Sequence, residues 1–398
     1  MTEQPVSAEE RAVLDLITLD EVTELTQRLV RAQGENPPGA EAATVAVLAD
    51  ACAGYGLPCT HTEVEPGREN LVVTLAGGPA AGLLLLGHTD VVPIGDGWTV
   101  DPIGGLVRDG RLFGRGSTDM KGGLAACVVA MAALRTAGVQ LSGPVDLAAV
   151  VDEEETGKGI RHYIKEDRSN YRGCIVAEPT DLQTIIAARG DAYFEFTVHG
   201  RAAHSGKPSD GVNAIYGAAS LVADLETWQQ ELAASPHPLA GPPTWSVGQI
   251  HGGTGTSIVP AECLVSADRR LLPGESPSAV VEQVGARVAS LNLEERAITV
   301  DVRMTMEMPG FETPVDHRFV VAADRALSAV GGPGLPLGGW TAACDGGFVA
   351  RDAGIPVVVL GPGSVADQAH RADESVALDE LLVAARTYAL TAMRLLHP

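Results

Sequence analysis

Residues 83–90 read Leu-Leu-Leu-Leu-Gly-His-Thr-Asp and join an uninterrupted apolar run to metal-capable polar side chains. Apolar runs without polar alternation are typical of strands that are buried on both faces of a mainly parallel sheet. Further runs of this kind lie at residues 145–151, 174–177 and 356–360. Residues 120–137, between the first two runs, are alanine-rich and have the length of a crossover helix. The order strand, helix, strand predicts an α/β domain.

A second domain is indicated at residues 193–198, where apolar and polar side chains alternate. Such alternation is typical of antiparallel sheet with one solvated face. The segments that follow predict the order β-α-β-β-α-β, a small ferredoxin-like α+β unit. We therefore expect a main domain of residues 1–188 and 307–398, interrupted by an inserted domain at residues 189–306.

Composition excludes several classes of partner. The chain has 28 Lys and Arg against 51 Asp and Glu, a formal net charge of −23, whereas nucleic-acid binding needs a basic face. No apolar run approaches the ~20 residues that span a bilayer, and the polar start lacks the pattern of a signal peptide. The cysteines form no C-x-x-C pair, which predicts buried thiols. We expect a cytoplasmic protein without a nucleic-acid or membrane partner.

Side chains that can bind a metal follow each apolar run. The runs lead to His88, to the acidic residues 152–155, to Glu178 and to a loop that reaches His370, while Asp119 precedes the predicted crossover helix. Functional groups gather beyond the carboxyl ends of parallel strands, so we expect these side chains at one edge of the sheet. Imidazoles and carboxylates together suit Zn²⁺-like ions. Taken singly, each residue also has an ordinary interpretation, such as a helix cap.

These motifs resemble those of the M20 family of metallopeptidases and amidohydrolases, which includes acetylornithine deacetylase, succinyl-diaminopimelate desuccinylase and glutamate carboxypeptidase. The resemblance runs from about residue 15 to the C-terminus. It implies a zinc-peptidase-like fold, with a mainly parallel sheet flanked by helices and an inserted lid or dimerisation domain. The matching segments are Gly87–Pro93 (GHTDVVP), Gly114–Gly123 (GRGSTDMKGG), Asp152–Gly157 (DEEETG), Ala177–Thr180 (AEPT) and Ala369–His370.

The resemblance implies two Zn²⁺ ions per subunit, although Co²⁺ or Mn²⁺ would suit the same ligands. Asp119 is expected to bridge the ions. The ligands that complete the two sites are expected to be His88 and Glu178 for one, and Glu155 and His370 for the other.

Two acids are expected to assist the reaction. Asp90 resembles the acid that orients the imidazole of His88. The family pattern Glu-Glu-x-Gly falls on residues 154–157 and makes Glu154 the general base, but three consecutive glutamates leave Glu153 as a competitor. A metal-bridged hydroxide would attack the amide carbonyl while the base transfers a proton to the leaving amine. The resemblance also implies a cis peptide bond between Asp119 and Met120.

Three residues of the inserted domain match substrate-binding positions of the family. His204 resembles a histidine that contacts the substrate carbonyl, from its own or the neighbouring subunit. Arg270 resembles an arginine that binds a substrate carboxylate, and Asn213 is a third candidate. The ordinary interpretations are a turn histidine, a surface ion pair and a helix start.

Taken together, these features predict a metal-dependent amidohydrolase that cleaves N-acyl amino acids, of the acetylornithine deacetylase type, and that forms a homodimer. A dipeptidase or carboxypeptidase of the same family, acting on short peptides, is the alternative. A catalytically silent, metal-stabilised binding protein is a third hypothesis, although no base or ligand is missing from the sequence.

Overall fold

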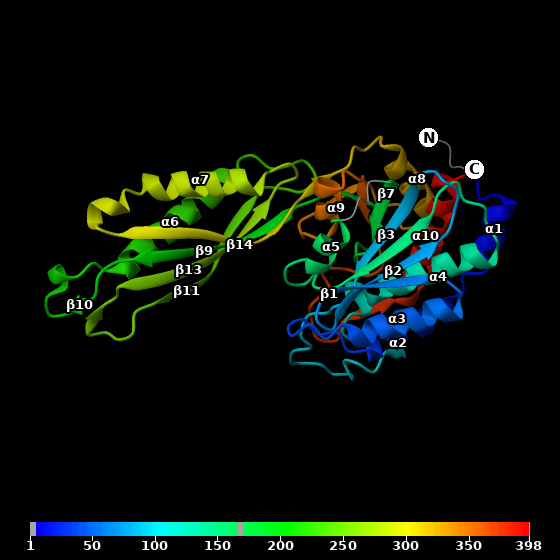
Figure 1. Ribbon diagram of the computed structural model, residues 1–398, viewed down its shortest axis with the longest axis horizontal. Coiled ribbons are helices and arrows are strands. Elements are labelled where there is room, and N and C mark those ends of the chain that lie inside the picture. The colour runs from blue at the N-terminus through cyan, green and yellow to red at the C-terminus, as the bar shows by residue number, and fades with distance from the viewer. Residues whose placement is uncertain (1–4, 166–169, 398) are drawn as a thin grey trace. The chain divides into compact units, whose positions relative to one another are not determined.

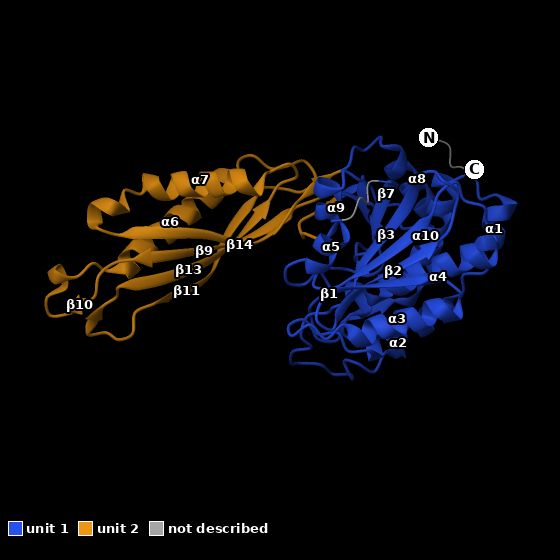
Figure 2. Cartoon of the chain, viewed as in Figure 1, with its two compact units in different colours: residues 1–186, 313–338, 345–398 blue, residues 187–312, 339–344 orange. Residues whose placement is uncertain are grey.

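The chain forms two compact units. The computed structural model describes residues 5–165 and 170–397. Unit 1 comprises residues 1–186, 313–338 and 345–398, and unit 2 comprises residues 187–312 and 339–344 (Figure 2). Residues 187–188, 307–312 and 339–344, which we expected in the main domain, group with unit 2. The carbonyl oxygen of Trp340 accepts a hydrogen bond from the backbone N–H of Arg189 there.

The largest sheet has nine strands in the order β1-β2-β6-β3-β7-β17-β8-β15, with β16 paired to β8. Four adjacent strands in the middle of this sheet run parallel to one another, namely β6, β3, β7 and β17. This arrangement confirms the predicted mainly parallel α/β core. Strands β3 and β6 are buried along their whole lengths, which explains their uninterrupted apolar sequences. The strands are β1 (Cys59–Glu65), β2 (Arg68–Leu75), β3 (Gly82–His88), β6 (Val145–Val150), β7 (Tyr171–Val176), β8 (Ile185–Ala188), β15 (Phe311–Glu312), β16 (Gly338–Trp340) and β17 (Val357–Val359).

Helices flank this sheet (Figure 1). Helix α4 is the predicted crossover helix; it packs against α10 and α2 and is buried over most of its length. The helical segment Ser117–Thr136 is long and apolar enough to cross a membrane, but its most apolar stretch is buried inside the unit, as in core helices of globular domains. A short three-stranded sheet, β18-β5-β4, completes unit 1. These elements are α1 (Ala8–Leu14), α2 (Leu19–Arg31), α3 (Ala42–Gly54), β4 (Leu106–Arg108), β5 (Arg111–Phe113), η1 (Ser117–Lys121), α4 (Gly122–Thr136), α5 (Lys158–Tyr163), α8 (Arg318–Ala329), α9 (Gly346–Asp352), β18 (Ser375–Ala377) and α10 (Leu378–Leu395).

Unit 2 has a four-stranded antiparallel sheet in the order β11-β13-β9-β14. Helices α6 and α7 separate its strands in the predicted order β-α-β-β-α-β. Strands β10 and β12 form a separate pair. The elements are β9 (Gly190–His199), β10 (Ala203–His204), η2 (Pro208–Asp210), α6 (Ala214–Leu232), β11 (Thr244–Gly252), β12 (Ile258–Val259), β13 (Glu262–Leu271), α7 (Pro277–Ser290), η3 (Leu293–Arg296) and β14 (Thr299–Met308).

The core of unit 2 follows from the alternation along β9. Phe194 and Phe196 are fully buried, whereas Tyr193 is exposed. The buried face packs against residues of both α6 and α7, including Leu221 and Val280. Both helices therefore cover the same face of the sheet, as an α+β unit with two layers requires.

Candidate metal centre

The metal-capable side chains of unit 1 come from one edge of the parallel strands. His88 ends β3 and pairs with Val150, the last residue of β6, so the acidic turn after β6 begins beside His88. Glu178 follows the end of β7. His370 lies in the loop after β17, and Asp119 lies in η1 ahead of α4. The carboxyl ends of neighbouring parallel strands share an edge, which explains why residues distant in sequence meet here.

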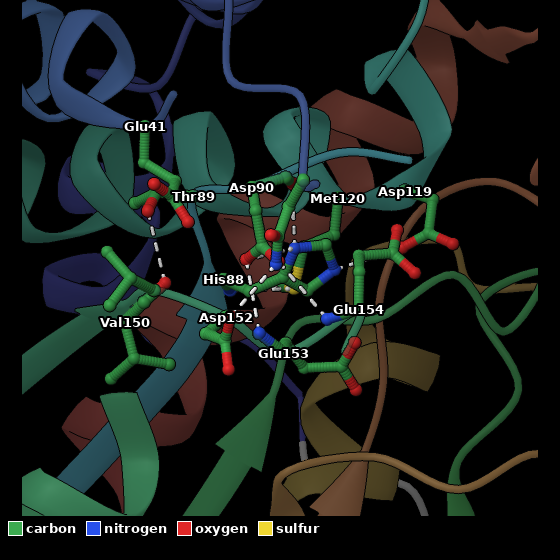
Figure 3. Close-up of polar contacts among 12 residues, drawn as sticks. Glu41, His88, Thr89, Asp90, Asp119, Met120, Val150, Asp152, Glu153 and Glu154 are labelled. Carbon is green, nitrogen blue, oxygen red and sulfur yellow. Dashed lines mark hydrogen bonds and ion pairs between the residues drawn. The ribbon is translucent and has the colours of Figure 1, made fainter. Parts of the chain in front are cut away.

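His88 is buried and has acids on both sides of its ring. Its Nε2 lies 3.1 Å from Oδ1 of Asp119 and 3.4 Å from Oε1 of Glu178. Its Nδ1 lies 2.9 Å from the backbone oxygen of Asp90 and 3.5 Å from the carboxylate of Asp90 (Figure 3). An imidazole that donates from Nδ1 to Asp90 presents its Nε2 lone pair to the two carboxylates. That arrangement requires a positive charge at Nε2, from a proton or a metal ion.

Asp119 lies between two imidazoles. Its Oδ1 faces His88, and its Oδ2 lies 3.2 Å from Nε2 of His370. The backbone agrees with expectation, because the Asp119–Met120 peptide bond is cis. Each carboxylate oxygen thus faces a different histidine, which is the geometry that a bridging ligand of two ions needs.

The positions of the consecutive glutamates 153–155 are shifted by one residue relative to the sequence expectation. Glu154, which we expected to be the base, places Oε2 at 3.2 Å from Nε2 of His370, where we expected Glu155. Glu155 is exposed and takes part in no described contact of this centre. A donor atom of Glu153 lies within 4.8 Å of those of His88 and Glu178. The structure therefore brings Glu153 and Glu154 to the centre and leaves Glu155 outside it.

The local backbone explains this shift. Asp152 adopts the left-handed region with φ 69°, and its backbone oxygen accepts hydrogen bonds from the N–H groups of Thr156 and Gly157. The turn closes back on Asp152, which carries Glu155 outward. Counting forward from the strand end at Val150 would have given the observed register, whereas counting back from Gly157 did not.

The acidic side chains crowded at the centre shift the pKa values of its histidines and of one another. Burial alone lowers the pKa of His88, but Glu178, Asp119 and Asp90 outweigh it and raise that pKa well above its ordinary value. Hydrogen bonds with Asp119 and Glu154 raise the pKa of His370 to about 10. Burial, reinforced by the charge of Asp119, raises the pKa of Glu178 to about 7.

The pKa values of the other acids are shifted in different directions, depending on their neighbours. Burial raises the pKa of Asp119, but the imidazoles of His370 and His88 outweigh it and hold that pKa below its ordinary value. Burial raises the pKa of Glu153 and of Glu154. Without cations the raised pKa values of Glu153 and Glu154 favour their protonated forms, and divalent cations would take the place of those protons.

The donor set fits two divalent cations. Imidazole nitrogens and carboxylate oxygens suit Zn²⁺ and its neighbours in the periodic table. The carboxylate oxygen Oε1 of Glu154 is buried and has no hydrogen-bond partner, so it is available to a cation. Two overlapping groups have donor atoms within 4.8 Å of one another, and they are His88, Glu153 and Glu178, and His88, Asp119 and Glu154.

The three substrate-binding candidates lie in unit 2 and have local partners. Nδ1 of the exposed His204 accepts a hydrogen bond from the N–H of Gly206 at 3.0 Å. Asn213 caps α6, because its Oδ1 accepts from the N–H of Ile215. The guanidinium of Arg270 donates twice to Asp268 and lies 3.2 Å from Asp191.

Comparisons with known proteins show which proteins this chain is similar to. The acetylornithine deacetylase of Proteus mirabilis (strain HI4320) is 32% identical over 327 residues, which cover 81% of each chain. That of Vibrio vulnificus (strain CMCP6) is 32% identical and covers 85% of this chain and 87% of the relative. Among solved structures, an M20 family metallo-carboxypeptidase from Sulfolobus solfataricus has a TM-score of 0.78 at 19% identity and covers 95% of this chain and 100% of that chain.

A tripeptidase from Staphylococcus aureus has a TM-score of 0.76 at 21% identity, over 96% of this chain and 100% of that chain. At these identities the solved structures establish the fold. Residues 84–394 also match the sequence profile of peptidase family M20/M25/M40. This range includes every residue of the centre described above. The chain therefore belongs to peptidase family M20/M25/M40.

Proposed function

We propose that this protein is a dinuclear metal amidohydrolase that cleaves the amide bond of N-acyl amino acids. The observation that carries the proposal is Asp119 with one carboxylate oxygen facing each of two imidazoles, beside a cluster of buried and half-buried acids. The choice of N-acyl amino acids is supported by the similarity to acetylornithine deacetylases, at 32% identity over most of both chains.

We assign the ligands by geometry. His88 and Glu178 would hold one ion, Glu154 and His370 the other, and Asp119 would bridge them. When bound, two divalent cations supply positive charge that polarises a carbonyl and lowers the pKa of water. Zn²⁺ is our proposed metal, because structural and catalytic zinc sites use these ligand types.

Glu153 is our proposed general base. It is the remaining acid of the cluster, near His88 and Glu178 but outside the pairs that flank Asp119. Burial raises the pKa of its carboxyl group, and a base with a raised pKa can both accept and return a proton. Glu153 would take the proton from the attacking water and give it to the amine nitrogen as the amide bond breaks.

His204 and Arg270 remain proposed substrate contacts. The ring of His204 is exposed and accepts only a backbone hydrogen bond through Nδ1 among the contacts described, which leaves Nε2 for a carbonyl oxygen. Arg270 is held by Asp268 and Asp191, so a substrate carboxylate would compete with these acids. Asn213 serves as the cap of α6, and we assign it no substrate contact.

A dipeptidase or carboxypeptidase activity is the second candidate, because the same centre can hydrolyse a peptide bond. The decisive experiment compares N-acetyl amino acids, including acetylornithine, with dipeptides under zinc, after chelation and after zinc is restored. Faster turnover of acyl amino acids that is lost with chelator and regained with zinc supports the first proposal. Preference for dipeptides favours the second. Inactivity on both panels with both ions bound would favour the silent binding protein.

Two finer proposals concern the assembly and the compartment. We propose a homodimer, because β11 is an edge strand of the unit 2 sheet and edge strands offer pairing sites. A monomeric mass in solution would contradict it. We propose that the enzyme acts in the cytoplasm, which is supported by six cysteines that form no disulfide with one another in the described part of the chain.

A further inference from the structure

We propose that Arg68 is a positioning residue for the turn that carries Glu153 and Glu154, and that it acts through Asp152. The inference rests on the proposed function, because it explains how the proposed base and ligand are held. Arg68 lies at the start of β2, and Asp152 lies just beyond the end of β6. Strands β2 and β6 are antiparallel, so the start of one lies beside the end of the other.

Asp152 fixes the conformation of the acidic turn. Its backbone is in the left-handed region, which a non-glycine residue adopts only when its surroundings hold it there. Its side chain accepts hydrogen bonds from the hydroxyl of Thr156 and from the N–H of Lys158. A change at Asp152 would therefore move the residues that follow it, among them Glu153 and Glu154.

Arg68 supplies the positive charge that holds Asp152. Its Nη1 lies 2.9 Å from Oδ1 of Asp152, and its Nε donates to Glu41 at 3.0 Å. The side chains of Arg68, Asp152 and Glu41 are only 10%, 3% and 0% exposed. Two buried carboxylates thus depend on one guanidinium, because buried charges need a partner of opposite sign.

A hydrogen-bonded path connects this ion pair to the centre. The amide of Asn36 donates to Oδ1 of Asp152 at 3.2 Å and to Oδ2 of Asp90 at 2.9 Å. The carboxylate of Asp90 accepts the N–H groups of Glu153 and Glu154, at 3.2 and 3.1 Å, and also faces Nδ1 of His88 (Figure 3).

Arg68 therefore acts on the glutamates from two directions. It holds Asp152, which precedes them in the chain. Asp152 also binds Asn36, and Asn36 in turn orders Asp90, which accepts the N–H groups of the two glutamates. Arg68 itself has no described contact with the metal-capable side chains that we assign as ligands.

The test compares Arg68→Met with the control Arg394→Met. Arg394 is 9% exposed and pairs with Glu10 at 2.7 Å, so the control removes an equally buried arginine from an ion pair of α1 and α10. Hydrogen exchange in the metal-free protein reports on the turn directly. We expect the N–H groups of Glu153 and Glu154 to exchange about tenfold faster in Arg68→Met and to be unchanged in Arg394→Met.

Kinetics of the zinc-loaded protein provide the second readout. We expect Arg68→Met, measured at saturating zinc, to lower kcat by about 100-fold while KM changes little, because misplacing a reacting group mainly affects the chemical step. We also expect weaker zinc binding, because the turn carries the proposed ligand Glu154. If Arg68→Met does not fold, Arg68→Lys decides, since a single ammonium cannot pair with Glu41 and Asp152 as the guanidinium does.

Unchanged exchange at both N–H groups in the folded variant overturns the proposal, and so does an unchanged kcat. The two proposals fail separately. A wild-type protein that hydrolyses no substrate contradicts the proposed function, whereas the exchange rates in the metal-free protein still decide whether Arg68 positions the turn.

Discussion

Nε2 of His370 lies 3.2 Å from Oε2 of Glu154. This contact fixes the register of three consecutive glutamates, because only one of them can occupy that position. Glu154 thereby becomes the proposed ligand, and the residue before it the proposed base. The three glutamates therefore have different proposed roles, and replacing each with glutamine should change metal content and kcat differently.

Glu153→Gln is expected to retain both metal ions and to lose activity. Removing a general base costs about 10²–10⁴-fold in rate, and glutamine keeps the size of the side chain. Metal content measured by elemental analysis and kcat measured on the best substrate check this together. Retention of wild-type kcat would return the role of base to another residue.

Glu154→Gln is expected to weaken the ion at His370, because an amide replaces a charged ligand. The measurement is metal content after dialysis, with loss of about one ion per chain as the expected result. Glu155→Gln is the matched control. Its side chain is exposed, and we expect both metal content and kcat to stay at wild-type values. A larger effect at residue 155 than at residue 154 would contradict the assignment.

Metal binding is expected to release protons and to strengthen as pH rises. His370, with its pKa raised to about 10, is an imidazolium at neutral pH in the metal-free protein, and an ion can bind Nε2 only after that proton leaves. Calorimetry of zinc binding in two buffers of different ionisation enthalpy measures the release. Identical heats in both buffers would show that no proton is released.

The same pKa shift has the opposite effect on the stability of the metal-free protein. The pKa of His370 is higher in the folded protein than in the unfolded chain, where it is about 6.5. Protonation of His370 therefore stabilises the folded protein, and this contribution is complete below about pH 6.5. The contribution is lost as pH rises through about 10. Metal-free wild type should therefore lose more stability than His370→Gln between neutral and alkaline pH, as measured by urea unfolding.

Glu374→Gln is expected to destabilise the segment that carries Asp119. Glu374 is fully buried, pairs with Nη1 of Arg115 at 2.6 Å and accepts the N–H groups of Thr118 and Asp119. Leaving Arg115 buried without its partner costs about 3–5 kcal/mol. Urea unfolding measures the loss.

The exposed pair of Arg303 and Glu195 provides the control for this measurement. Glu195→Gln should cost less than about 1 kcal/mol, because solvent already screens that pair. Equal losses in the two variants would show that the buried pair is not essential.

The sequence predicted the parts of the centre that are set by strand ends. Buried strands must be apolar, so His88 and Glu178 could be placed at the end of each run. The register of residues 153–155 could not be placed in this way, because identical side chains carry no pattern and the turn depends on Asp152. Arg68 and Asn36 were missed for a related reason, since antiparallel pairing and a loop bring them to Asp152 from far along the chain.

Gly123→Ala is expected to disturb the centre through close backbone packing. A Cβ at Gly123, in α4, would lie 2.1 Å from the backbone oxygen of Ala177, the residue before Glu178. Backbone cannot move aside as a flexible side chain can, so the helix and the strand end must separate. We expect a loss of roughly 1–3 kcal/mol, as for other overpacked sites, together with weaker metal binding.

Gly285→Ala separates this steric effect from helix propensity. Gly285 lies in α7, and a Cβ there would meet nothing within 4 Å. Alanine should therefore stabilise the helix by about 0.5–1 kcal/mol. Unfolding by urea and zinc titration of both variants measure the two effects. Opposite signs in stability, with zinc affinity reduced only in Gly123→Ala, are expected because only Gly123 lies against the segment that carries a proposed ligand. Wild-type zinc affinity in Gly123→Ala would show that Glu178 does not depend on this contact.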